Sequence, residues 1–328
     1  MVFREERAMS ESVESIPAAP LVTVIIQAYN RSNILGYVIR TVLAQTHSDW
    51  ELLVIGDECT DATGEVVASF SDPRIRFCNL ESRVGDQSGP TNEGIRLARG
   101  RYIALLNHDD FWFPDHLAHA VAAIESSGAD LVFTLQLEAD PDGRWRVNAA
   151  FPEGRFDPVT HPNASTWLFR RELPQRIGSL KRRDKVWSFP TREWLWRAYR
   201  SGARLASVDA ITVIVISSTT RRNTYSERQW DEHAAVHAAM TGNPYFREKC
   251  LIEAWTHTNP THLRGYSIGL LLREVVLRLQ GRIVQLIGRD PVSLYCYYRI
   301  PQKWGFIPKR GAVIAELYRR RGLPNEDA

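Results

Sequence analysis

Short β-branched runs alternate with amphipathic helical patterns over the first third of the chain, and this alternation constrains the fold more than any other feature. Strands separated by single helices at this spacing are typical of βα units, whose strands pair in parallel and whose helices cover both sheet faces. The residues therefore predict an α/β fold with a mostly parallel sheet. The expected strands are Leu21–Ile26, Glu51–Ile55, Arg74–Asn79 and a run from Tyr102, and the expected helices are Ile34–Ala44, Thr60–Phe70 and Thr91–Ala98.

Acidic clusters follow two of these strands. Asp57, Glu58 and Asp61 come after the second strand, and Asp109 with Asp110 ends the fourth. Parallel strands end at one edge of a sheet, so we expect the two clusters to face a single cleft. This convergence is a more specific signal for a ligand site than either cluster alone.

The adjacent carboxylates of Asp109 and Asp110 repel each other unless a positive group lies beside them. Mg²⁺ and Mn²⁺ prefer oxygen ligands and share them with phosphates, so the pair favours a divalent metal that carries a phosphorylated substrate. The alternative is that both residues only cap a helix that Pro114 begins.

Composition and motifs exclude several classes of protein. With 328 residues, 44% of them apolar and 24% charged, the chain can form one large domain with an appendage or two modest domains. Its four cysteines lack the spacing of a zinc site or disulfide framework, which favours reduced thiols in a cytosolic protein. No apolar run of about 18 residues predicts a transmembrane helix. Gln27–Asn30 supplies no Gly-rich phosphate loop, which disfavours a hydride-transfer enzyme and a sugar-phosphate nucleotidyltransferase.

Positive charge is concentrated at the carboxyl end. Residues Arg264–Ala328 contain 12 Lys and Arg against 5 Asp and Glu, although the whole chain carries a net charge of only +3. No nucleic-acid-binding motif accompanies this segment, so anionic lipid or a phosphorylated acceptor fits it at least as well.

Four segments, in order and at the right spacing, resemble the family 2 glycosyltransferases, which have the GT-A fold. V-T-V-I-I-Q-A-Y-N-R is similar to the family's V-S-V-I-I-P-T-Y-N-R, and T-V-L-A-Q-T-H-S-D-W-E to S-V-L-x-Q-T-x-x-x-x-E. V-I-G-D-E-C-T-D-A-T corresponds to V-V-D-D-G-S-T-D-x-T. N-E-G-I-R-L-A-R-G-R-Y-I-A-L-L-N-H-D-D matches N-x-G-x-x-x-A-x-G-x-Y-I-x-x-L-D-x-D-D. The segments are Val22–Arg31, Thr41–Glu51, Val54–Thr63 and Asn92–Asp110.

This resemblance implies an inverting transfer of a sugar from a nucleoside-diphosphate sugar, in bacterial cell-surface polysaccharide or glycolipid synthesis. It implies a glycan or lipid-linked acceptor, no nucleic acid, and Mn²⁺ or Mg²⁺ as a Lewis acid for the departing diphosphate. Asp57 would bind the base. The residues implied at the nucleotide sugar are Ala28, Tyr29, Arg31, Asp57, Asn92, His108 and Asp109, and those implied at the metal are Asn107, Asp109 and Asp110.

The sequence departs from the family pattern at the metal motif. Asn107 stands where the first Asp of D-x-D is usual, and Gly56 and Thr91 replace a frequent Asp and Arg. The amide oxygen of Asn107 can still coordinate, with Asp110 as a second carboxylate. His108 is either a ligand or a solvent-facing spacer, and the spacer is favoured. These departures leave an alternative open: a catalytically silent GT-A homologue that binds nucleotide sugar or glycan within an assembly.

An inverting transfer needs a general base, which the family supplies near the start of a later helix. The candidates here are Glu193 and, second, Asp184. Thr191 with Glu193 is also a capping arrangement, and the neighbouring Trp194 and Trp196 either pack or stack on a sugar. A site without a base would have diminished or unusual activity.

Other polar groups have two interpretations each. Arg221 and Arg222 follow a predicted strand, Ile211–Ile216, and resemble the late segment that closes over the diphosphate in this family, although an exposed turn is equally compatible. His233 and His237 are four residues apart and could hold a metal, but a solvated helix face is favoured.

We expect three parts of the chain: a flexible leader at 1–20, a GT-A domain at 21–225 and a helical basic region at 226–328. The GT-A domain divides into a nucleotide-sugar half at 21–137 and an acceptor half at 138–225. In the last region Ser267–Arg289 predicts an amphipathic helix, for which packing or oligomerisation is favoured over membrane contact aided by Arg319–Arg321. The expected location is cytoplasmic, with peripheral contact at the inner face of the cell membrane as a further option.

Overall fold

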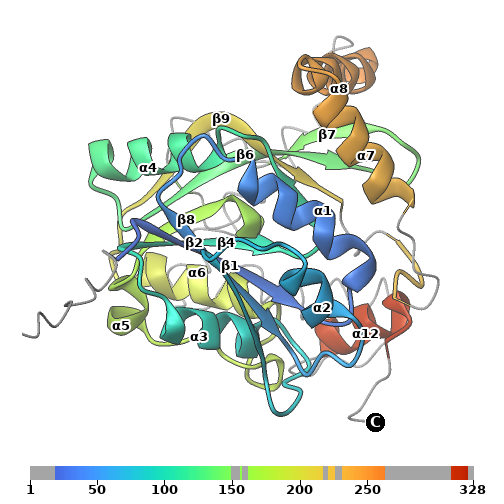
Figure 1. Cartoon of the computed structure of the whole chain (residues 1–328). Helices are drawn as coiled ribbons and strands as arrows, with labels where there is room; N and C mark the ends of the chain where they lie inside the picture. The colour runs from blue at the N-terminus through green and yellow to red at the C-terminus, as the bar shows by residue number, and fades with distance from the viewer. Residues whose placement is uncertain are drawn as a thin grey trace, which may run out of the picture.

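The computed structural model describes residues 19–148, 156, 162–216, 221–225, 231–262 and 312–323. Within them, nine strands form one sheet in the order β3-β2-β1-β4-β8-β6-β9-β5, with β7 paired to β6 (Figure 1). The strands are β1 Val22–Ala28, β2 Trp50–Gly56, β3 Ile75–Asn79, β4 Tyr102–Asn107, β5 Asp110–Trp112, β6 Leu131–Ala139, β7 Trp145–Asn148, β8 Trp167–Arg170 and β9 Leu205–Val215.

The first four strands are parallel, as the alternating pattern predicts. β1 pairs with β2 on one side and β4 on the other, and β2 pairs with β3. In this register Ala28 lies opposite Gly56, and Gln27 lies opposite Asn107. The carboxyl ends of β1, β2 and β4 are therefore level, which brings the two acidic clusters to one edge.

The other half of the sheet is mixed. β8 joins β4 and β6 in antiparallel pairs, β6 runs parallel to β9, and β5 pairs antiparallel with β9. Asp110 opens β5 and therefore follows β4 into the sheet within three residues. The helix after it begins at His116 with Asp115 as N-cap, so the alternative that Asp109 and Asp110 cap this helix is wrong.

Helices cover both faces of the sheet (Figure 1). Alternate residues of β1 explain this arrangement, since Val24 and Ile26 belong to one apolar core and Ile25 to the other. Burying each such side chain contributes about 1.5–3 kcal/mol. The α-helices are α1 Ser32–Leu43, α2 Thr63–Ala68, α3 Ser88–Leu97, α4 His116–Ser127, α5 Leu173–Ile177, α6 Pro190–Arg200, α7 Asp231–Gly242, α8 Phe246–His262 and α12 Ala312–Arg321; η2 Ala164–Thr166 and η3 Arg183–Lys185 are 3₁₀ turns.

Gly94 allows α3 to lie close to β1. A Cβ atom at this position would come within 2.5 Å of the Ile25 side chain, far inside van der Waals contact. The close approach fixes the helix, and the loop that precedes it, against the sheet edge that carries the acidic residues.

Two parts of the chain that are distant in sequence meet beside that edge. The backbone N–H of Asn223 donates to the carbonyl of Arg320 at 2.8 Å, and that of Tyr225 donates to the carbonyl of Arg321 at 3.1 Å. These bonds attach α12 to residues 221–225, and Figure 1 shows α12 beside the end of the sheet near α2.

No helix in the described ranges is both long and apolar enough to cross a membrane. The predicted helix Ser267–Arg289 and nearly all of the predicted leader at 1–20 lie outside the described residues.

Candidate active site

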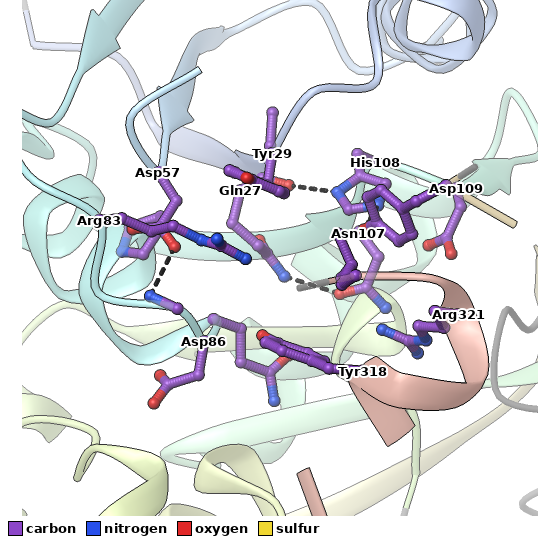
Figure 2. Close-up of a pocket in the computed structure, with 16 residues that line it drawn as sticks. Gln27, Tyr29, Asp57, Arg83, Asp86, Asn107, His108, Asp109, Tyr318 and Arg321 are labelled. Atoms are coloured by element: carbon purple, nitrogen blue, oxygen red, sulfur yellow. Dashed lines mark hydrogen bonds between the residues drawn. The ribbon is translucent and has the colours of Figure 1, made fainter. Parts of the chain in front are cut away.

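A cavity lies at the carboxyl ends of β1, β2 and β4 (Figure 2). The loop before α3 forms one side of it, and Tyr225 and α12 form another. Its polar character and its place at a strand-end edge are those of a ligand site in an α/β fold. The lining residues are Gln27, Ala28, Tyr29, Asp57, Arg83, Gly85, Asp86, Gln87, Pro90, Asn107, His108, Asp109, Tyr225, Tyr318, Arg321 and Leu323.

Asp57 organises the loop that borders the cavity. Its two carboxylate oxygens accept hydrogen bonds from the backbone N–H groups of Val84 and Gly85, each at 2.8 Å. Burial raises the pKa of Asp57, although these two bonds oppose the shift. Gly85 has φ of +76°, a left-handed conformation that suits glycine. Asp57 thus both lines the cavity and holds the loop in place.

Aromatic rings and arginines form a layered wall. The Arg83 guanidinium lies 4.1 Å from the centre of the Tyr29 ring, and Tyr29 contacts Tyr225 with ring centres 6.3 Å apart. The Arg31 guanidinium lies 4.6 Å from the centre of the Tyr225 ring and donates to the Thr224 carbonyl at 2.6 Å. Arg31 is only 2% exposed, so it supports the wall from behind.

Asn107 is engaged in a buried polar network. Its Oδ1 accepts from Gln27 Nε2 at 2.6 Å, and its Nδ2 donates to Asp110 and Asn163 at 2.8 and 2.9 Å. Ser165 also donates to Asp110, at 2.5 Å. Gln27 and Asn107, two departures from the family pattern, are therefore partners of each other. The predicted metal ligands Asn107 and Asp110 have their side chains occupied by protein groups.

His108 is held as a neutral imidazole. Its Nδ1 lies 2.9 Å from the Gln27 carbonyl oxygen, which can only accept, so this nitrogen carries the proton. Its Nε2 then accepts from the Tyr225 hydroxyl at 3.0 Å. Burial lowers the pKa of His108 to about 4. Because both ring nitrogens have partners, the favoured expectation of a solvent-facing spacer is wrong.

Asp109 and Asp110 differ in ionisation although they are adjacent. Burial opposes the ionisation of Asp109, but the adjacent His108 ring and the positive charges of Arg31 and Arg321 outweigh it and lower the pKa of Asp109. Burial and the neighbouring Asp109 raise the pKa of Asp110, which is 1% exposed. Of these two adjacent residues, Asp109 is therefore the one that brings negative charge to the cavity.

His233 of α7 supports Asp109 from behind. Its Nε2 lies 3.2 Å from the backbone carbonyl of Asp109, and its side chain packs edge-on against Phe111. The residue is 3% exposed, so the favoured expectation of a solvated helix face is wrong for it. His237 contacts Phe111 and Tyr37 and does not form a metal pair with His233.

The described residues contain no cluster of three or more His, Cys, Asp or Glu side chains that could enclose a metal. Asp109 presents an oxygen donor to the cavity just after β4, and Asp57 and Asp86 are the other carboxyl groups in its lining. Mg²⁺ is commonly held by one or two carboxylates together with substrate phosphates and water, and such a donor set needs no protein cage. The residues present therefore fit a divalent ion that arrives with a diphosphate and do not fit a permanent, fully protein-bound metal.

The candidate bases have ionic partners outside the cavity lining. Glu193 accepts from Lys181 at 2.7 Å and from Arg197 at 2.8 Å. Asp184 is exposed on η3 and lies 3.2 Å from Lys185. Helix α6 begins at Pro190 with Phe189 as N-cap and has no side-chain capping bond, so the capping interpretation of Thr191 is wrong. Trp194 and Trp196 are 1% and 8% exposed and pack within the protein.

Three other predicted residues also lie apart from the cavity lining. Asn92 exchanges two 2.9 Å hydrogen bonds with the backbone of Leu180, and Arg221 forms an ion pair with Glu232. Arg222 is exposed.

The sequence interpretation missed several lining residues: Arg83, Asp86, Tyr225, Tyr318 and Arg321. The basic run Arg319–Arg321 was visible in the sequence, but nothing in it indicates contact with a strand edge two hundred residues earlier.

Comparison with known proteins identifies the domain. The family described as Glycosyl transferase family 2 matches residues 23–173. Succinoglycan biosynthesis protein ExoO of Rhizobium meliloti is 35% identical over 161 residues, which are 48% of this chain and 46% of that protein. An Escherichia coli protein named UDP-Glc:alpha-D-GlcNAc-diphosphoundecaprenol beta-1,3-glucosyltransferase WfgD is 34% identical over 34% of this chain and 44% of its own length. The chain thus spans less than half the length of these relatives.

Solved structures agree in fold. S. aureus TarS 1-349 in complex with UDP-GlcNAc superposes with a TM-score of 0.52 at 16% identity, covering 92% of each chain. The mannosyltransferase PcManGT from Pyrobaculum calidifontis, in complex with GDP-Man and Mn²⁺, gives a TM-score of 0.50 at 16% identity over 93% of this chain and 88% of that one. Together with the strand-edge cavity, these similarities show that residues 23–173, a little under half of the chain, form a family 2 glycosyltransferase domain of the GT-A fold.

Proposed function

We propose that this protein transfers a sugar, with inversion, from a nucleoside-diphosphate sugar to a glycan or lipid-linked acceptor in bacterial polysaccharide synthesis. The observation that carries the proposal is the cavity in which Asp57 and Asp109, from the ends of two parallel strands, face one space. The names of the relatives support the acceptor class, since one is assigned to succinoglycan biosynthesis and another acts on a diphosphoundecaprenol-linked sugar.

The donor would lie across the strand ends. Its base would occupy the side formed by Tyr29, Asp57 and Arg83, where the stacked arginine and the loop backbone offer flat and polar contacts. Its diphosphate would lie toward Asp109. A divalent ion held there by Asp109 would supply Lewis-acid stabilisation of the departing diphosphate. His233 and His108 fix the backbone and surroundings of that carboxylate.

The acceptor hydroxyl requires a base, and Glu193 with Asp184 as second candidate remains the prediction. For Glu193 to accept a proton it must exchange at least one of its contacts to Lys181 and Arg197. An acceptor that brings its own negative charge, such as a lipid-linked diphosphate, would compete for these two cations.

Calorimetric titration tests the proposal. The purified protein is titrated with UDP, GDP and dTDP, each with and without Mn²⁺, alongside Asp109→Asn. We expect metal-dependent binding of one nucleotide and at least about a hundredfold weaker binding in the variant, because a metal–carboxylate contact is lost. Asp142→Asn, on the exposed hairpin where Asp142 pairs with Arg144, is the matched control and should bind as the wild type does. Metal-independent binding that is equal in all three proteins would contradict the proposed role of Asp109.

A catalytically silent GT-A homologue is the second candidate. The observations that favour it are the protein contacts that occupy Glu193 and Asn107. Slow hydrolysis of the bound nucleotide sugar in the absence of an acceptor would support the enzyme. Tight binding with no release of nucleoside diphosphate, even with lipid-linked acceptors supplied, would support the silent homologue.

A further inference from the structure

The three arginines that end α12 do not have the same surroundings. Arg319 and Arg320 both pair with Glu316 one turn earlier, at 2.7 and 2.9 Å. Arg321 lines the cavity instead, and within the described ranges its guanidinium has no carboxylate partner. Its Nε is buried without a hydrogen-bond partner. A buried donor left unpaired is costly, which indicates that a ligand completes this site.

Arg321 lies at the end of the cavity where we propose that the diphosphate binds. Figure 2 shows it on α12, across the cavity from the strand end that carries Asn107, His108 and Asp109. Arg321 and Asp109 line the same cavity, and no ion pair joins them in the part of the chain that the structure describes. Arg83, the other arginine that lines the cavity, lies over Tyr29 at the end near Asp57.

Two other nearby arginines, Arg31 and Arg221, form hydrogen bonds or ion pairs with protein groups. Arg31 donates to the Thr224 carbonyl beneath Tyr225, and Arg221 pairs with Glu232 and donates to the Ala139 carbonyl. Neither residue is part of the cavity lining. A phosphate group beside Asp109 would therefore find its guanidinium contact in Arg321.

Helix α12 is attached firmly enough to place that guanidinium. Its last carbonyls accept from the backbone of Asn223 and Tyr225, and the Tyr225 hydroxyl donates to His108, next to Asp109. Tyr318, one turn before Arg321, also lines the cavity and lies 5.6 Å from the Arg183 guanidinium. Tyr225 and helix α12 thus form one connected wall, which is tied to the strand end that carries Asp109 through the Tyr225–His108 hydrogen bond.

We propose that Arg321 binds the diphosphate of the donor and that α12, more than a hundred residues beyond the matched family segment, is a structural part of the donor site. This inference rests on the proposed function. A guanidinium binds phosphate oxygens in a bidentate, charge-assisted manner, and a divalent ion held by Asp109 would neutralise further charge of the diphosphate. The two walls then share the charge of the diphosphate.

The test compares the affinity for a nucleoside diphosphate with the affinity for its nucleoside, so that contacts to the diphosphate are distinguished from contacts to the nucleoside. Arg321→Gln, Arg321→Lys and the control Arg319→Gln are titrated with the nucleoside diphosphate that the wild type binds, and with its nucleoside. We expect Arg321→Gln to weaken diphosphate binding about tenfold to a hundredfold, the range for a lost hydrogen bond to a charged group, and to leave nucleoside binding unchanged. Arg321→Lys should recover part of the affinity, and Arg319→Gln should bind normally.

The outcomes are distinguishable. Unchanged diphosphate affinity in Arg321→Gln would overturn the inference and leave the proposed function intact. No nucleotide binding by the wild type would overturn both. An equal loss of diphosphate and nucleoside affinity in Arg321→Gln, with Arg321→Lys no better, would show that the arginine only shapes the cavity. Equal thermal unfolding midpoints among the variants establish that all are folded.

Discussion

The two walls of the cavity come from parts of the chain with different sequence character. The wall made by the ends of β1, β2 and β4 lies inside the matched family segment, and it contributes carboxylates and backbone groups (Figure 2). The opposite wall, made by Tyr225 and α12, lies outside that segment and contributes Tyr318 and Arg321. The matched segment therefore supplies the carboxylates of the site together with Arg83, whereas Arg321 is supplied by a part of the chain that the family match does not cover.

Asn107 belongs to the wall formed by the strand ends, and it stands where the family usually has an aspartate. Restoring the usual residue by Asn107→Asp should not improve metal binding, because the two donors of the amide to Asp110 and Asn163 would be lost and a third carboxylate would join the cluster. We expect a loss of about 3 kcal/mol in unfolding free energy, measured by urea denaturation at pH 7.5.

Asn243→Asp is the control for that experiment, since its side-chain oxygen accepts from the Tyr245 N–H and an aspartate can do the same. Equal stability of Asn107→Asp and the wild type, together with tighter Mn²⁺ binding, would show that the polar network adapts to the carboxylate.

The variant Arg221→Gln tests whether Arg221 only stabilises the fold or also makes the diphosphate contact that we propose for Arg321. Its ion pair with Glu232 and its bond to the Ala139 carbonyl are structural, so the variant should lose about 2 kcal/mol of unfolding free energy. Its affinity for nucleoside diphosphate should stay within about twofold of the wild type, because a contact that stabilises only the fold is absent from the binding equilibrium. A large loss of affinity with unchanged stability would reassign the diphosphate contact from Arg321 to Arg221.

His116 is a buried histidine, and its protonation affects the stability of the fold. It stacks on Trp112 and hydrogen-bonds Thr212 at 2.7 Å, and burial lowers its pKa to about 3. The unfolded chain therefore binds a proton that the folded chain does not, so stability is complete above about pH 6.5 and falls as the pH drops from there toward 3.

For His116 this effect amounts to about 1.4 kcal/mol between pH 7.5 and 5.5. His116→Gln should remove that part of the pH dependence, measured as the difference in urea unfolding free energy between the two pH values. His119→Gln, on the same helix but half-exposed, should keep it. An identical pH dependence in all three proteins would mean that His116 titrates normally in the folded state.

Arg222→Gln should have the smallest effect. The side chain is exposed beside the buried Arg221, so both stability and nucleotide affinity should stay within about 0.5 kcal/mol of the wild type. A tenfold weaker affinity would indicate that residues 221–225 carry a diphosphate contact in addition to Arg321.

Much of the first wall was predictable because its signals are local. The β-branched runs, the turn residues and the acidic clusters at strand ends are read directly from neighbouring residues. The four predicted strands up to Tyr102 are confirmed, and their specified ends differ from the observed ones by at most two residues. β5 was missed because a strand of three residues has too short a pattern, and its pairing with β9 is a contact across a hundred residues.

The roles of individual polar groups were less predictable. Asn107, His108 and His233 have amide or imidazole groups that suit several partners, and the sequence does not show which partner is near. Their hydrogen bonds to Gln27, Tyr225 and the Asp109 backbone exist only once β1, β4 and α7 have packed together.

The sequence by itself determined the α/β architecture, the family and the placement of Asp57 and Asp109 at one sheet edge, because strand periodicity and strand-end chemistry are properties of short segments. Only the tertiary structure decided which of the adjacent carboxyl groups, Asp109 or Asp110, is ionised and which cation faces it. Those properties depend on burial and on charges a few ångströms away, and Arg321 reaches Asp109 from more than two hundred residues along the chain.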